Sequence, residues 1–134
     1  MKTISLLITF LVGTLISQAQ DLTVTVDNVS STEGKVIFSL HTNMTFMNGA
    51  GIQNLESKIV DGKVTVTFKD VEPGTYAIMV LHDKNENNRM DFYDDGLPKE
   101  SYGMSNNPTH YGPPKFTNAK FEMASENIHL NIRF

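Results

Sequence analysis

Apolar and polar side chains alternate with a period of two along most of this chain, and no segment shows a sustained helical period. Successive side chains of a β-strand point to opposite faces, so this pattern is typical of strands with one buried face. The clearest examples are LTVTVDNV (22–29), KVIFSLHT (35–42), KVTVTFKDV (63–71) and IHLNIRF (128–134). The pattern predicts an all-β chain built from antiparallel sheets.

Turn-forming residues separate these segments. Asp61-Gly62 predicts a two-residue hairpin turn, Glu33-Gly34 separates the first two strands, and Pro73-Gly74 precedes TYAIMVLHD (75–83). This last segment is apolar on both faces, which predicts a central strand that is covered on both sides. Six or seven short strands with such turns predict a β-sandwich of about seven strands.

The first nineteen residues have the pattern of a signal peptide. Lys2 precedes an apolar run from Ile4 to Ile16, and Ser17-Gln18-Ala19 is a small-x-small cleavage pattern, which predicts a cut after Ala19. The run is shorter than the ~20 residues that span a bilayer, which disfavours the alternative of an N-terminal membrane anchor. A single exported domain over residues 20–134, periplasmic or extracellular, is therefore expected.

The composition of the chain argues against several classes of function. The chain has no Cys, so neither a disulfide nor a thiol nucleophile is available. Its net charge is −4 and it has no basic run, which argues against nucleic-acid binding. No second apolar segment is long enough to cross a membrane after signal cleavage.

One long segment, about 83–114, breaks the strand pattern. Loops above ~12–15 residues are uncommon in compact domains and are usually functional or disordered. This one contains aromatic residues and many turn formers, which predicts an ordered loop. Its tyrosines, Tyr93, Tyr102 and Tyr111, could form a ligand surface that stacks on sugar rings, or could pack the loop.

The start of this loop fits the spacing of a calcium-binding loop. That template requires oxygen-bearing side chains at positions one, three, five, nine and twelve, and a backbone carbonyl at position seven. Counted from the end of the preceding strand, these positions are Asp83, Asn85, Asn87, Asp91 and Asp94, with Arg89 at position seven. The spacing predicts weak calcium binding, in the ~10⁻⁴–10⁻³ M range of extracellular modules.

Two positions depart from the template, and a loop without metal is the alternative. Position six is normally Gly, and here it is Asn88, which tolerates positive φ better than other residues. Position twelve is normally Glu, and here it is the shorter Asp94, with Asp95 as a possible substitute. A solvated Asp/Asn turn without a cation would have the same composition.

Other chemistry has weaker support in the sequence. His82, Asp83 and His110 could bind zinc, but their spacing matches no zinc motif, and a hydrogen-bonded structural His82 is the alternative. Ser101 and Ser105 occur in the long loop, but the G-x-S-x-G motif of hydrolases is absent. We therefore expect a protein that is not an enzyme, with a metal-assisted hydrolase as the minor alternative.

Three blocks of the sequence resemble a known family. They are PGTYAIMVLHDKNENNRMD (73–91), GLPKESYGMSNNP (96–108) and GPPKFTNAKFEM (112–123). The chain resembles the secreted bacterial proteins of domain of unknown function 2141, except that Asn88 stands where the family usually has Gly. The resemblance implies one exported domain with no established activity. By analogy, the G-x-Y strand suggests the strand order of prealbumin or carboxypeptidase regulatory domains. The expected sandwich is thus prealbumin-like or immunoglobulin-like.

These observations predict an exported β-sandwich module with a calcium-stabilised loop, acting as a binding or structural domain of the cell envelope or the extracellular space. Its partner would be a glycan, a peptide or an envelope protein. A carbohydrate- or peptide-binding module that uses the loop tyrosines is the alternative.

Overall fold

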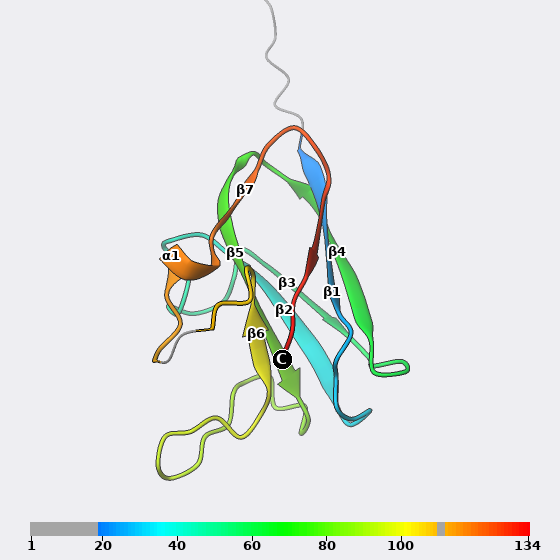
Figure 1. Ribbon diagram of the computed structural model, residues 1–134, viewed down its shortest axis with the longest axis vertical. Coiled ribbons are helices and arrows are strands. Elements are labelled where there is room, and N and C mark those ends of the chain that lie inside the picture. Colours follow the sequence, from blue (N-terminus) through cyan, green and yellow to red (C-terminus); the bar gives the residue numbers. More distant parts are fainter. Residues whose placement is uncertain (1–18, 110–111) are drawn as a thin grey trace, which may run out of the picture.

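The segments with alternating side chains form the strands of a two-layered β-sandwich (Figure 1). The computed structural model describes residues 19–109 and 112–134 of the chain. Apart from Ala19, the expected signal peptide lies outside the described residues. The elements are β1 (Gln20–Val26), β2 (Lys35–His41), β3 (Gln53–Ser57), β4 (Val64–Val71), β5 (Gly74–Asp83), β6 (Tyr102–Met104), α1 (Phe116–Ala119), β7 (Phe121–Met123) and β8 (Ile128–Asn131).

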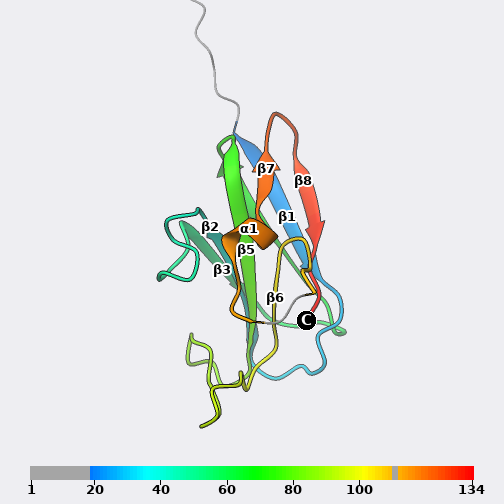
Figure 2. The same cartoon turned by 60° about the vertical axis from the view of Figure 1, so that its left-hand side comes forward.

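The strands are divided between a three-stranded and a five-stranded sheet, which Figure 2 shows from the side. The smaller sheet has the order β4-β1-β8, and the larger has the order β3-β2-β5-β6, with β7 also paired to β5. The pairs are antiparallel except β1 with β8, which run parallel. The prediction of an all-β sandwich is thus confirmed, and the parallel pair is a difference that local alternation cannot reveal, because both directions give the same pattern.

The core lies between the two sheets and consists of the side chains that the alternation assigns to one face. Six of them, three each from β1 and β2, are completely buried: Leu22, Val24, Val26, Val36, Phe38 and Leu40. Burial of this apolar surface, at about 25 cal/mol per Å², is the main favourable term that holds the two layers together.

Strand β5 is central and covered on both faces, as its apolar sequence predicts. It pairs with β2 on one edge and with β6 and β7 on the other. Ile78 and Val80 face the core, whereas Ala77 faces outward and is equally buried. The outward residue packs against Phe46, Met104 and Ala119, which form a second, smaller apolar cluster on the outer face of the large sheet.

The Asp61-Gly62 turn forms as predicted, but it does not join two paired strands. Both residues have positive φ, 52° and 71°, and the flanking Val60 and Lys63 form a single bridge. Beyond that bridge, β3 and β4 enter different sheets. The turn signal is local, whereas the choice of sheet depends on which faces pack together.

The long segment after β5 is only partly a loop. The three residues of β6 pair with β5, and α1 adds one helical turn beyond it. Both elements are too short to give a periodic signal in the sequence. Within residues 19–109 and 112–134, no helix has the length and apolar character needed to cross a membrane.

Candidate functional site

The acidic loop (84–101) follows β5. The last two side chains of β5 point to opposite faces of the large sheet. His82 points into the core, and Asp83 points outward beneath the loop, where it is fully buried. The two carboxylate oxygens of Asp83 accept the backbone N–H groups of Asn87 at 3.2 Å and Asn88 at 2.8 Å. Asn88 has a φ of 63°, the conformation expected at this position of the template. Asp83 therefore fixes the first turn of the loop.

Two more of the expected ligand residues, Asn85 and Asn87, contact the carboxylate of a third, Asp91. Asn85 Nδ2 donates to Asp91 Oδ2 at 2.8 Å, and Asn87 Nδ2 lies 2.9 Å and 2.8 Å from the two oxygens of Asp91. The backbone N–H of Arg89 donates to Asn87 Oδ1 at 3.1 Å. The structure thus brings Asp83, Asn85, Asn87 and Asp91 into one hydrogen-bonded network, with the backbone of Arg89 on its edge.

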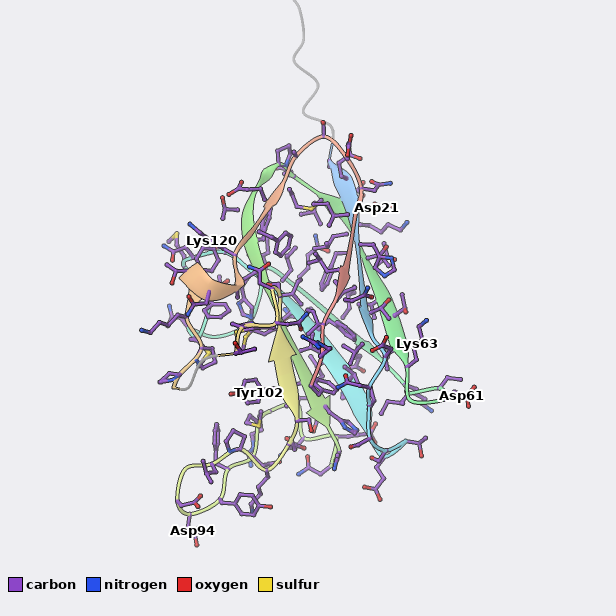
Figure 3. All side chains as sticks on the ribbon, in the orientation of Figure 1. Asp21, Asp61, Lys63, Asp94, Tyr102 and Lys120 are labelled. Carbon is purple, nitrogen blue, oxygen red and sulfur yellow. The ribbon has the colours of Figure 1, made fainter. Side chains whose placement is uncertain are left out.

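Asp94 does not join this network. It is exposed, and Figure 3 places it at the far tip of the loop, directed away from the sandwich. Asp95 is also exposed, and its Oδ1 accepts the N–H of Leu97 instead. The backbone N–H of Lys99 donates to the carbonyl of Asp91 at 2.8 Å, so residues 92–98 form a projection between these two residues.

Glu100, which the template spacing does not include, is a buried carboxylate next to this network. It is 7% exposed, and its two oxygens accept the N–H groups of Lys84 at 3.0 Å and Asp91 at 3.3 Å. The sequence spacing missed this residue because the projection inserts extra residues between Asp91 and Glu100. The signal that could have found it is the PKES segment of the second family-like block.

The carboxylates alone do not make a metal centre. Among the described residues, no three His, Cys, Asp or Glu side chains are grouped closely enough to hold a metal ion. A cation in this loop would therefore need the amide oxygens of Asn85 and Asn87 in addition to carboxylates. In the structure both amides turn their nitrogen atoms toward Asp91, so each would have to rotate by 180° to present its oxygen.

The positions of His82 and Asp83 do not favour the alternative of a zinc site. His82 Nε2 lies 2.8 Å from the carbonyl oxygen of Glu33, and its ring stacks on Phe134 at 6.1 Å within the sandwich. Asp83 lies on the opposite face of the sheet, and His110 lies outside the described residues. His82 is thus a hydrogen-bonded structural residue, although its Nδ1 atom has no partner among the described residues.

Lys35 ties the acidic loop to the sheet below it. Its Nζ atom lies 2.7 Å from Glu56 Oε2 on β3 and 2.6 Å from Asn88 Oδ1 in the loop. The hydrogen bond to Glu56 raises the pKa of Lys35, and the charges of Glu56, Asp83 and Glu86 act in the same direction. One cation thus faces three carboxylates at this end of the sheet.

A groove of about 640 Å³ runs over the outer face of the large sheet, between the acidic loop and the smaller apolar cluster. Ile37, Met79 and Leu81 form its floor, Met47 lies on one side, and Phe92 of the acidic loop lies on the other. Figure 2 shows both loops, 42–51 and 84–101, on the same side of the molecule. The volume is in the range of small-molecule sites, ~300–1,000 Å³.

Comparison with family models gives one match, over residues 24–131, to a family described as uncharacterized protein conserved in bacteria (DUF2141). The chain belongs to this family. Comparisons with curated proteins and with solved structures gave no significant match. The recognition made from the three sequence blocks is therefore confirmed.

In this DUF2141 chain, the Ser-Asn-Asn triplet (105–107) at the end of the second sequence block has a structural role. Ser105 Oγ accepts the N–H of Ile78 at 2.9 Å and donates to the carbonyl of Ala119, and it is fully buried. Asn106 Nδ2 donates to two carbonyls, those of Asn118 and Lys120. The Ser-Asn-Asn triplet therefore joins β5, α1 and the following chain, and the Ser105 hydroxyl is already engaged twice.

The three tyrosines of this DUF2141 chain do not form one surface in the part that the structure describes. Tyr102 lines the groove and points away from the core (Figure 3). Tyr93 is 56% exposed on the projecting tip, where Lys99 Nζ lies 5.3 Å from its ring centroid. Tyr111 lies outside the described residues.

Proposed function

We propose that this chain is an exported, non-enzymatic binding module in which calcium orders the acidic loop, and the ordered loop forms one wall of the groove. The ligand set would be Asp83, Asn85, Asn87, Asp91 and the backbone carbonyl of Arg89, with Glu100 in place of Asp94. The module would act in the periplasm or outside the cell.

The observation that carries the proposal is the convergence of both Asn amides on Asp91. Two oxygens bound to one calcium ion at ~2.4 Å lie about 2.9 Å apart when they are adjacent ligands. The amide nitrogens of Asn85 and Asn87 lie 2.8–2.9 Å from the Asp91 oxygens. Rotation of each amide would place oxygens at this spacing without moving the backbone.

The electrostatic balance supports the same conclusion. Asp83 and Glu100 are buried, and Asp91 is half-buried beside them. Arg89 Nε lies 3.9 Å from Asp91 Oδ1, and the Arg89 side chain is 77% exposed. A divalent cation would compensate this charge far better than one solvated guanidinium.

Export is supported by the sequence and by where the first strand starts. The expected cut after Ala19 would release a chain that begins at Gln20, and Gln20 is the first residue of β1. The lack of Cys means that stability in an oxidising compartment has to come from packing or a bound ion.

We infer that the chain is not an enzyme, because the loop residues that could act in catalysis are already hydrogen-bonded. Ser105 is buried and bonded to two backbone groups, so it is not free to attack a substrate. The loop carboxylates Asp83, Asp91 and Glu100 are occupied by backbone or amide N–H groups. Asp83 and Glu100 are also buried, so neither carboxylate is placed to take a proton from a substrate as a general base.

The test is thermal unfolding of the mature protein in EDTA and in ~10 mM calcium, with magnesium as the control ion. At a hundredfold excess over Kd, binding to the folded state alone adds ~2.7 kcal/mol to the free energy of unfolding. For a domain of this size the shift in Tm is about 10 °C. An unchanged Tm in the wild-type protein would contradict the calcium proposal.

A matched pair of variants locates the ligands. Glu100→Gln removes the charge at the proposed ligand, and Asp94→Asn removes a charge at the tip of the same loop. For each variant, Tm in calcium is compared with Tm in EDTA, so that the structural cost of the substitution cancels. We expect Glu100→Gln to reduce the calcium shift strongly and Asp94→Asn to leave it intact. The reverse result would show that the tip folds back and that Asp94 is the ligand.

A further inference from the structure

The floor of the groove is apolar, and its backbone N–H and C=O groups are already used in strand pairing. Ile37 on β2 and Met79 and Leu81 on β5 form this floor. Both strands are internal to the sheet: β2 pairs with β3 and β5, and β5 pairs with β2 and β6. Their N–H and C=O groups are used in these ladders. A peptide lying on this floor would lose water from its own backbone groups and gain no partner, at a cost of ~1–3 kcal/mol for each group.

The walls of the groove are apolar and include two methionines. Met47 on one side and Met90 and Phe92 on the other complete the lining with thioether and aromatic groups. Met47 and Phe92 are 60% and 57% exposed, a high fraction for large apolar side chains. Methionine adapts to irregular shapes because it is unbranched and polarizable. These walls suit a long apolar body of variable conformation, such as an alkyl chain.

The charge in the lining of the groove is negative. Glu56 is the only charged residue in the lining, and no Lys, Arg or His of the described residues lines the groove. The Ser39 hydroxyl, also in the lining, makes no hydrogen bond within residues 19–109 and 112–134. Lys35 lies nearby, but it is held by Glu56 and Asn88. An anionic head group would therefore find no cation in the lining, whereas a donor would find the Glu56 carboxylate, which is 61% exposed although it is paired with Lys35.

We propose that the groove binds a single-chain amphiphile in its monomeric form, with an alkyl body and a hydrogen-bond-donating head group that is uncharged or cationic. The alkyl chain lies on Ile37, Met79 and Leu81, and the head group lies beside Glu56 and Ser39. The inference rests on the proposed function in one respect, because the calcium-ordered loop supplies the wall that contains Phe92.

The direct test compares dodecylamine with dodecanoate, which have the same chain length and opposite head-group charge. Binding is measured at pH 7.5 by isothermal titration, below the aggregation limit of each compound and in the presence of calcium. We expect dodecylamine to bind at least about tenfold more tightly than dodecanoate, a difference of ~1.4 kcal/mol. Equal affinity, tighter binding of dodecanoate, or no binding of either compound would overturn the proposal.

Three variants assign the binding to the groove. Ser39→Phe places a ring on the outer face between Met79 and Asn54, its neighbours on the adjacent strands, and should weaken dodecylamine binding at least about tenfold. Glu56→Gln keeps the shape and should reduce the preference for the amine over the acid. Val60→Ser, at a 68% exposed apolar residue outside the groove, should change neither quantity. Loss of binding with Val60→Ser but not with Ser39→Phe would place the site elsewhere.

Two further measurements separate this inference from its premise and from membrane binding. A calcium-dependent Tm shift without dodecylamine binding would refute the amphiphile and leave the calcium loop standing. Binding that is equal in calcium and EDTA, with no Tm shift, would refute the calcium loop and leave the groove. Sedimentation with neutral phosphatidylcholine vesicles should recover no protein. Recovery with vesicles, without binding of monomeric dodecylamine, would show that the surface binds bilayers instead.

Discussion

The side-chain amide of Asn107 pairs with the backbone of Arg133 as if it were part of a strand. Its Oδ1 accepts the N–H of Arg133 at 2.8 Å, and its Nδ2 donates to the carbonyl of Asn131 at 3.0 Å. Asn131 is the last residue of β8, whose other edge pairs with β1, and Arg133 lies two residues beyond it. One side chain therefore closes part of the free edge of the small sheet and ties it to the segment that follows β6.

Replacement of Asn107 by Ala should destabilise the fold by about 2 kcal/mol. Two hydrogen bonds to the backbone are lost, and Ala is strained at the φ of 45° that Asn tolerates. Urea unfolding of the variant should show a lower midpoint with an unchanged slope. Asn48→Ala, which removes a single exposed bond to the Met44 carbonyl, should cost less than about 0.5 kcal/mol. Equal effects of the two substitutions would contradict the structural role of Asn107.

Gly34 and Gly96 offer a matched pair of substitutions by Ala. Both have positive φ, 71° and 84°, so Ala is strained at either position by ~1 kcal/mol. At Gly34 a Cβ atom would also lie 2.1 Å from the carbonyl oxygen of Asp83, whereas at Gly96 it would meet no atom within 4 Å. We expect Gly34→Ala to lower the free energy of unfolding by more than about 3 kcal/mol, and Gly96→Ala by about 1 kcal/mol. Similar values in urea unfolding would show that the β1–β2 turn can move away from the acidic loop.

The sequence predicts those parts of the fold that depend on local pattern. The alternation in 22–26 and 36–40 identifies the buried face, because a side chain's direction in a strand depends only on its position. The sequence does not predict that β1 pairs in parallel with β8, nor that β3 and β4 separate into different sheets. Those choices depend on the packing of whole faces and on contacts more than a hundred residues apart in the chain.

In the candidate site, too, the sequence predicts the residues that are close together in the chain and misses those that are far apart. Asp83, Asn85, Asn87 and Asp91 were found because the turn that unites them is local and short. Glu100 was missed because a seven-residue projection separates it from Asp91, and the length of a projection is not encoded in a fixed spacing. The groove was also missed, since its walls come from two loops that meet only after the sheet has formed.

Limited proteolysis with trypsin should report the order of the acidic loop directly. Arg89 has a side chain that is 77% exposed, and cleavage after it requires the loop to open locally. If calcium binds the closed loop, cleavage at Arg89 should slow by about tenfold or more in calcium relative to EDTA. Lys63, exposed in the hairpin that carries Asp61, is the internal control and should be cut at the same rate in both conditions (Figure 3). Parallel changes at both sites would indicate an effect on the protease.

Stability should fall as the pH is lowered below about 6.5, and His41 should account for part of the fall. Burial lowers the pKa of His41 from the ordinary value of 6.5, although its contact with Thr45 acts in the opposite direction. The unfolded chain therefore binds a proton at a pH where the folded chain does not, and the free energy of unfolding decreases from pH 6.5 down to the folded pKa. The ring makes an edge contact with Phe46 at 5.8 Å, so protonation would also disturb the smaller apolar cluster.

The measurement for His41 combines two readouts, because the chain has four histidines. An NMR titration of the ring proton signals should give a midpoint for His41 below 6.5. Urea unfolding at pH 7.5 and 5.5 should then show a smaller difference in the His41→Gln variant than in the wild-type protein, since Gln carries no titratable proton. A midpoint above 6.5 would mean that protonated His41 is stabilised in the folded state, and the expected loss of stability on acidification would reverse in sign.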